Sequence, residues 1–241
     1  MVVTPVYSSN LSRLERLSLN NTLLLTKPYE HIFIGPEFVK GYFKNLYPKS
    51  DFLVLPKSNF KSIRSYNRLM LSPWFYKLFS NYSHILICQL DVCLMKQLNL
   101  NGLLKYDYVG APCTFGLGNK AYVGNGGFSL RKVSSFIDVL ENGFKSVSIK
   151  WKECVTNKQI ARYFFNLLKL HRFYIVMGFI NEDLIVSLYL KKPLVVPDLN
   201  VSAEFCQDAL VCETVNPTAY HGWEKNLAMD MKQRCLKTIK N

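Results

Sequence analysis

Short apolar runs alternate along the chain with segments in which apolar residues recur at helical spacing. The longest run, 83–91, is continuously apolar from Ile85 to Cys88, which is typical of a strand buried on both faces of a parallel sheet. Shorter runs, several of them closed by glycine or proline, predict strands at Val2–Tyr7, His31–Ile34, Phe52–Leu55, Tyr106–Val109, Phe128–Leu130 and Pro193–Val196.

Amphipathic spacing predicts helices between most of these strands. The expected helical segments are Leu11–Leu25 with Ser9 or Asn10 as its cap, a turn at Pro36–Phe43, Ser65–Phe79, Lys132–Glu141, Lys158–Leu170, Asn181–Leu190 and the basic Glu224–Ile239. Alternation of strands and helices indicates the α/β class, with a mostly parallel central sheet flanked by helices. Because no repeat or linker interrupts the pattern, we expect a single domain over 1–241.

Composition supports a folded chain with anionic partners. The 241 residues are 49% hydrophobic, enough for one substantial core, and the net charge is +13. This positive net charge favours binding of nucleotide diphosphates, anionic lipid headgroups, acidic glycans or nucleic acid. Alternatively, the charge only keeps the protein in solution. Since no run of five basic residues occurs, even in the tail 232–240, a dedicated nucleic-acid tail is not expected.

The seven cysteines are an odd number and include no Cys-x-x-Cys pair. This argues against a zinc finger and against a disulfide framework, and favours a reduced, cytoplasmic chain. The first residues lack the basic and apolar regions of a signal peptide. No apolar stretch reaches the roughly 18 residues that a transmembrane helix needs.

A polar triplet, Gln89-Leu90-Asp91, ends the longest apolar run. In open α/β sheets, ligands bind outside the carboxyl ends of the strands, so Asp91 is well placed for function. Mg²⁺ and Mn²⁺ prefer oxygen ligands, and one or two carboxylates suffice where a diphosphate supplies the rest. The alternative is that Asp91 caps the next turn.

Gly124-Asn125-Gly126-Gly127 follows a glycine-containing loop, Cys113–Tyr122. Glycines allow a substrate to approach the backbone closely, but Asn-Gly is also a strong hairpin signal. The spacing matches neither a dinucleotide fingerprint nor a phosphate-binding P-loop. The loop is expected to be mobile.

Two further motifs carry titratable groups. Glu182 and Asp183 follow Asn181 at the start of a predicted helix, where they suit either a general base or a helix N-terminus. His221 stands between Tyr220 and Gly222, and suits either a metal site or an aromatic core. A strand-end carboxylate, an acidic pair and a late histidine would together suit a metal–diphosphate site with a separate base, the chemistry of sugar-nucleotide glycosyltransferases.

Five motifs occur in a fixed order: Gln89–Asp91, Asp107–Pro112, Val123–Arg131, Asn181–Asp183 and Ala219–Trp223. In this order they resemble the DUF5672 family of GT-A-like glycosyltransferases, and the resemblance spans roughly Ser65 to Trp223. It implies a GT-A fold, in which 1–112 mainly binds the nucleotide and 113–241 mainly binds the acceptor.

The resemblance also implies roles for individual residues. Asp91 and His221 would hold Mn²⁺ or Mg²⁺, although Gln89 stands where an Asp-x-Asp motif has its first acid. Asp183 would be the base, with Glu182 beside it. The acceptor would contact Asn181, Glu182 and Trp223. The donor would be held by residues from several segments: Thr4, Pro5, Tyr7, Arg64 (or Arg131), Gln89, Asp91, Gly126 and Gly127.

The function implied is transfer of a hexose, of galactose or glucose type, from a UDP-sugar to a saccharide hydroxyl in bacterial surface polysaccharide or lipopolysaccharide synthesis. Inversion, metal assistance and a lipid-linked glycan acceptor at the inner face of an anionic membrane are expected, without nucleic acid. Two other classes stay open. One is a non-catalytic basic module that binds nucleic acid or anionic glycan, and the other is a hydrolase built on the same carboxylates.

Overall fold

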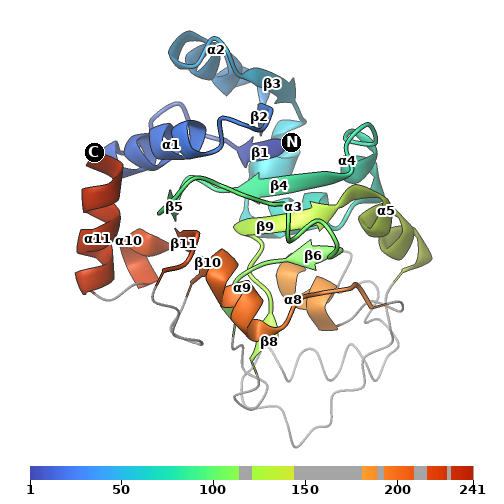
Figure 1. The fold of residues 1–241 in the computed structure, drawn as a ribbon. Coiled ribbons are helices and arrows are strands. Elements are labelled where there is room, and N and C mark those ends of the chain that lie inside the picture. Colours follow the sequence, from blue (N-terminus) through green and yellow to red (C-terminus); the bar gives the residue numbers. More distant parts are fainter. Residues whose placement is uncertain (114–120, 144–180, 189–192, 209–215, 227–228, 241) are drawn as a thin grey trace, which may run out of the picture.

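The computed structural model describes residues 1–113, 121–143, 181–188, 193–208, 216–226 and 229–240 (Figure 1). Its central layer is a six-stranded sheet in the order β3-β2-β1-β4-β9-β6. The strands are β1 Val2–Pro5, β2 His31–Gly35, β3 Asp51–Val54, β4 His84–Cys88, β6 Tyr108–Val109 and β9 Phe128–Lys132. β1 to β4 run parallel, and β9 is antiparallel to both β4 and β6. The prediction of a mixed α/β fold with a mostly parallel central sheet is therefore confirmed.

The continuous apolar run of β4 is explained by cover on both faces of the sheet. Ile85 and Ile87 belong to one core cluster, which includes Phe75 and Phe136 from the helices α4 (Pro73–Lys77) and α5 (Val133–Asn142). Leu86 and Cys88 belong to the opposite cluster. Because successive strand residues point to opposite faces, both halves of the run are buried.

Two helix boundaries differ from the predicted ones. Helix α1, Arg13–Leu25, is capped by Ser12 and not by Ser9 or Asn10, because Ser12 and Glu15 form a reciprocal capping box. The single helix predicted over Ser65–Phe79 is two helices, α3 (Ile63–Met70) and α4. Pro73 begins α4, where its missing N–H has no partner to lose.

Other helices follow the prediction more closely. The turn expected at Pro36–Phe43 is α2, Glu37–Leu46. A short 3₁₀ helix after β3, η1, Lys57–Phe60, was not predicted. The acidic motif opens α8, Glu182–Leu188, and the closing helix is present as α10, Trp223–Asn226, and α11, Met229–Lys240. The predicted helix Lys158–Leu170 and most of the loop Cys113–Tyr122 lie outside the described residues.

The strand predicted at Pro193–Val196 is wrong. These residues are irregular, although Val195 is tied to the edge of the sheet beside β6, where its carbonyl accepts the N–H groups of Asp107 and Tyr108. Apolar residues at the edge of a sheet can resemble a strand in sequence even when they form no strand pairing. Helix α9, Leu199–Phe205, follows.

A second, smaller sheet was not predicted. It consists of β10 Cys206–Gln207, β11 Ala219–His221 and β5 Val92–Leu94, in the order β10-β11-β5. A two-stranded ladder pairs β7, Pro112–Cys113, with β8, Tyr122–Val123. Strands of two or three residues carry no detectable period, which is why sequence reasoning missed them. Within the described part of the chain, no helix is long and apolar enough to cross a membrane.

His31 makes the fold sensitive to acid. Burial lowers the pKa of His31 to about 4, while Nε2 lies 2.9 Å from Thr4 Oγ1. In the unfolded chain His31 is protonated below about pH 6.5, whereas in the folded chain it is protonated only below about pH 4. We expect the free energy of unfolding to fall by up to about 3 kcal/mol as the pH drops through this window. Urea unfolding from pH 7 to 4 measures this, and His31→Gln should flatten the dependence; an unchanged slope in the variant would contradict the assignment.

Candidate functional site

The strand order places a topological switch point between β1 and β4. β2 and β3 lie on one side of β1 in the sheet, whereas β4 lies on its other side. Such a switch point is where open α/β sheets bind ligands, outside the carboxyl ends of the strands. Tyr7 follows β1, and Gln89 and Asp91 follow β4. Burial, then Glu15 and then Asp91 raise the pKa of Tyr7, so Tyr7 lies within electrostatic reach of Asp91.

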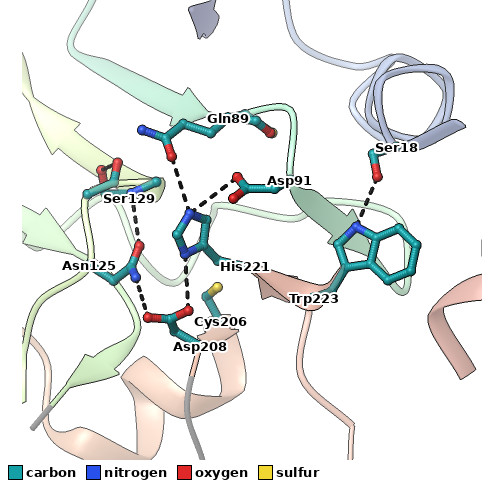
Figure 2. A network of polar contacts seen from close by, with 12 residues as sticks. Ser18, Gln89, Asp91, Asn125, Ser129, Cys206, Asp208, His221 and Trp223 are labelled. Atoms are coloured by element: carbon teal, nitrogen blue, oxygen red, sulfur yellow. Dashed lines mark hydrogen bonds and ion pairs between the residues drawn. The ribbon is translucent and has the colours of Figure 1, made fainter. Parts of the chain in front are cut away.

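The small sheet brings His221 to the same edge. β11 pairs antiparallel with β5, and His221 is opposite Val92, the residue after Asp91. The backbone N–H of Gly222 donates to the Asp91 carbonyl at 3.0 Å, which holds the two segments in register. As a result His221 Nε2 lies 3.4 Å from Asp91 Oδ1 and 3.2 Å from Gln89 Oε1 (Figure 2).

Asp208 completes this cluster from the end of β10. Its Oδ1 lies 3.2 Å from His221 Nδ1, and its Oδ2 accepts from Asn125 Nδ2 at 2.6 Å (Figure 2). Asn125 in turn accepts the N–H of Gly127 and has a positive φ of 58°. Sequence reasoning missed both Asp208 and Asn125 as site residues. Asp208 follows a two-residue strand and carries no motif signal, whereas Asn125 stands inside a motif that was considered for its glycines.

Two carboxylates hold the imidazole of His221 in a fixed orientation. Burial opposes its protonation, but the hydrogen bonds and charges of Asp208 and Asp91 outweigh burial and raise the pKa of His221 to about 9. The His221 side chain is 14% exposed and that of Asp91 is 35% exposed, so the Asp91 side of the cluster faces solvent. A small ligand can therefore reach it.

The glycine motif lies against this cluster. A Cβ atom at Gly127 would stand 2.0 Å from His221 Nε2, so only glycine leaves room for the ring. A Cβ atom at Gly126 would stand 2.1 Å from Glu182 Oε1. Because β8 pairs with β7 while β9 pairs with β4 and β6, the motif joins two sheets and is not the turn of a hairpin. Close backbone approach, and not a hairpin, explains these glycines.

A second polar cluster lies behind Gly126. Arg131 is fully buried on β9, and its Nη2 donates to Glu182 Oε1 at 2.7 Å and to the Gly126 carbonyl at 3.2 Å. Its Nη1 donates to the Tyr76 hydroxyl at 2.9 Å, and its Nε donates to Ser129 Oγ at 2.9 Å. Glu182 is buried as well, and its Oε2 has no hydrogen-bond partner among the described residues. This ion pair anchors the start of α8 to β9.

Within the described residues, no group of three or more His, Cys, Asp and Glu side chains is arranged to hold a metal ion. The pair Asp91 and His221 nevertheless has suitable donor chemistry. A metal ion would replace the Nε2 proton of His221 while Asp208 keeps its hydrogen bond with Nδ1, and carboxylate-oriented histidines of this kind are common metal ligands. The two residues fit a divalent cation that completes its shell with water or phosphate oxygens.

Comparisons with known proteins show the family. The family model described as "Protein of unknown function (DUF5672)" matches residues 49–221. This chain belongs to the DUF5672 family. No curated protein matches it. Among solved structures it is similar to the bifunctional IspDF of Campylobacter jejuni, with a TM-score of 0.37 and 7% identity over 59% of this chain and 43% of that chain. The chain therefore spans less than half of that enzyme.

The DUF5672 match contains the whole His221 cluster, from Gln89 and Asp91 through Asn125 and Asp208. Asp183 is buried at the start of α8 within the same match. After burial, the charges of Asp183 and Asp208 are the largest causes that raise the pKa of the Cys113 thiol. Both carboxylates are therefore within electrostatic reach of Cys113.

Several residues expected at the site have other surroundings in this DUF5672 protein. Trp223 is 1% exposed and donates from Nε1 to Ser18 Oγ at 3.0 Å, well away from the imidazole (Figure 2). Its position gives no support to an acceptor contact. Thr4 and Pro5 are buried in β1, whereas Asn181 is exposed before α8 and Arg64 is partly exposed on α3. Tyr7 is 59% exposed beside Asp91.

Proposed function

We propose that this DUF5672 protein is a GT-A-like glycosyltransferase that moves a hexose from a UDP-sugar to a saccharide hydroxyl. The observation that carries the proposal is the contact of Asp91 with His221 at the switch point of a mostly parallel sheet. A carboxylate, an imidazole and the exposed Tyr7 follow strands at this switch point, which would suit a diphosphate bound through a cation and a base stacked nearby. The net charge of +13 also favours a dianionic donor.

Asp91 and His221 would hold Mn²⁺ or Mg²⁺. The cation would stabilise the negative charge that develops on the departing diphosphate. Asp208 and Asn125 would keep the His221 ring in place, since both stand behind it in the hydrogen-bond chain. Gln89 would remain a hydrogen-bond partner of the site and not a charged ligand.

Asp183 would take the proton of the acceptor hydroxyl as general base, in a single displacement that inverts the anomeric centre. Glu182 would act beside it chiefly by neutralising Arg131, which it contacts at 2.7 Å. Asp183 is the other carboxylate of the acidic motif, and it lies at the start of α8. The exposed Asn181 would contact the acceptor.

The proposed setting is the synthesis of bacterial surface polysaccharide or lipopolysaccharide, with peripheral contact to an anionic membrane. Residues 1–112 would mainly bind the nucleotide, and 113–241 would mainly bind the acceptor. The net charge of +13 supports this setting, because Lys and Arg near anionic lipid gain roughly 1 kcal/mol each.

A thermal-shift panel tests the function. We expect UDP, but not GDP, CDP or ADP, to raise the melting temperature in Mn²⁺ and not in EDTA, because a cation held by Asp91 and His221 would supply the positive charge that binds the diphosphate. Asp91→Ala should lose the shift. The matched control, Asp51→Ala, removes an exposed carboxylate of β3 and should keep it.

The opposite results are informative. A UDP shift that persists in EDTA and in Asp91→Ala would remove the metal assignment. The absence of a shift with every nucleotide would favour the non-catalytic basic module. Release of free sugar from the donor at the same rate with and without acceptor would favour a hydrolase.

A further inference from the structure

Three sulfur atoms meet under the C-terminal helix, outside the site described above. Cys93 Sγ lies 3.8 Å from Met95 Sδ, and Cys235 Sγ lies 4.0 Å from the same Met95 Sδ. The Cys93 thiol also donates to the backbone carbonyl of Cys235, with 3.9 Å between Sγ and O. Met95 Sδ is therefore nearly equidistant from the two thiol sulfurs.

The fold explains why these residues meet. Cys93 and Met95 are two positions apart on and just after β5, so their side chains leave the same face of the strand. Helix α11 lies beside β5 (Figure 1), and Cys235 faces the strand within a cluster that includes Tyr220 and Trp223. Both thiols are fully buried, whereas Met95 is partly exposed. Of the three side chains, that of Met95 is thus the one that solvent reaches.

We propose that Cys93, Met95 and Cys235 bind one soft monovalent cation, Cu(I), in a trigonal all-sulfur site. Thiolate and thioether ligands select Cu(I) over the hard ions Mg²⁺ and Mn²⁺. A first-row metal–thiolate bond is about 2.3 Å, so three sulfurs around one ion in a plane stand about 4.0 Å apart. The separations of Met95 Sδ from the two thiol sulfurs, 3.8 and 4.0 Å, agree with this spacing.

The binding step needs no oxidant. Cu(I) arrives at Met95, replaces the protons of the two thiols, and forms three metal–sulfur bonds while its oxidation state is unchanged. The two protons go to solvent. Since Cys235 belongs to α11 and Cys93 to β5, the ion clamps the C-terminal helix to the small sheet that carries His221. Binding should therefore also raise the melting temperature.

The test is an anaerobic titration of the reduced full-length protein with Cu(I) buffered by a competing chelator. We expect one tightly bound ion per chain, with X-ray absorption showing three sulfur neighbours. Partners that only orient a metal ligand are worth about 10–100-fold in affinity, so Met95→Leu, which removes a direct ligand, should weaken binding at least about tenfold. Cys93→Ser and Cys235→Ser should abolish the tight site.

Two controls separate this site from other sulfur atoms. Met70→Leu changes a fully buried methionine in a different core cluster, and Cys88→Ser changes a buried thiol beside Thr22; both should bind as the wild type does. The melting temperature of each metal-free variant shows that it is folded. Tight binding that survives both Cys93→Ser and Cys235→Ser, or an affinity of Met95→Leu equal to that of the wild type, would overturn the proposal.

Discussion

Glu182→Gln is expected to lower the free energy of unfolding by about 3–5 kcal/mol, because it leaves the charge of Arg131 buried without a counter-ion. Arg131 has no exposed surface, and burial alone would lower its pKa; Glu182 and the surrounding tyrosines reverse this and raise it. Glutamine keeps the size of the side chain and an acceptor oxygen. The expected loss therefore comes from charge and not from packing.

Urea unfolding at pH 7 measures this loss, with Glu141→Gln as the matched control. Glu141 also forms an ion pair, with Lys77 at 2.7 Å, but both side chains are about half exposed. Exposed pairs contribute about 0–1 kcal/mol, so this variant should unfold almost as the wild type does. If the two variants lost equal stability, the buried pair would not anchor α8 to β9.

A double variant distinguishes the cost of a broken pair from the value of the intact one. Arg131→Met with Glu182→Leu removes both charges and fills the space with apolar atoms. Replacement of a whole buried ion pair by apolar residues is often neutral or stabilising by about 1–4 kcal/mol, so most of the loss should be recovered. The hydroxyl of Tyr76 loses its donor in this variant, which limits the recovery.

Gly127→Ala is expected to dismantle the His221 cluster. The added Cβ would stand 2.0 Å from His221 Nε2, so the ring must leave its position between Asp91 and Asp208. The pKa of His221, about 9 in the intact cluster, should then fall toward its usual value of about 6.5. In the wild type the stabilisation from this raised pKa is complete below about pH 6.5 and is lost as the pH rises through 9.

An NMR titration of the histidine ring protons in metal-free protein measures the shift, and any Mn²⁺-dependent stabilisation by UDP, as proposed above, should disappear with it. Gly102→Ala is the control, because a Cβ atom there meets nothing within 4 Å. A ring that still titrates near pH 9 in Gly127→Ala would mean that the glycine does not shape the site.

Periodicity along the chain was sufficient to predict the central sheet. The run ending at Cys88 is apolar at every position because β4 is covered on both faces, and this is visible without coordinates. Helix ends were predicted less well where one residue decides them. Ser12 rather than Ser9 caps α1, and Pro73 divides a pattern that otherwise reads as one helix.

The candidate site was predicted only in part. Asp91, Gly127 and His221 stand in short polar motifs after apolar runs, so each was recognised as a candidate, and the structure brings the three together. Asp208 has no such signal, since the strand before it has two residues and no period. The partner of Glu182 was missed for a different reason. An arginine in the middle of a strand pattern does not indicate which carboxylate it contacts.

The sequence by itself determined the α/β class, the buried strand β4 and the polar residues at its end, because side-chain burial imposes a period that neighbouring residues share. The tertiary structure alone decided which distant groups meet: Asp208 with His221, Glu182 with Arg131, and Cys235 with Cys93. These contacts depend on strand register and on the packing of α8 and α11, which are set by the whole core and not by any local pattern.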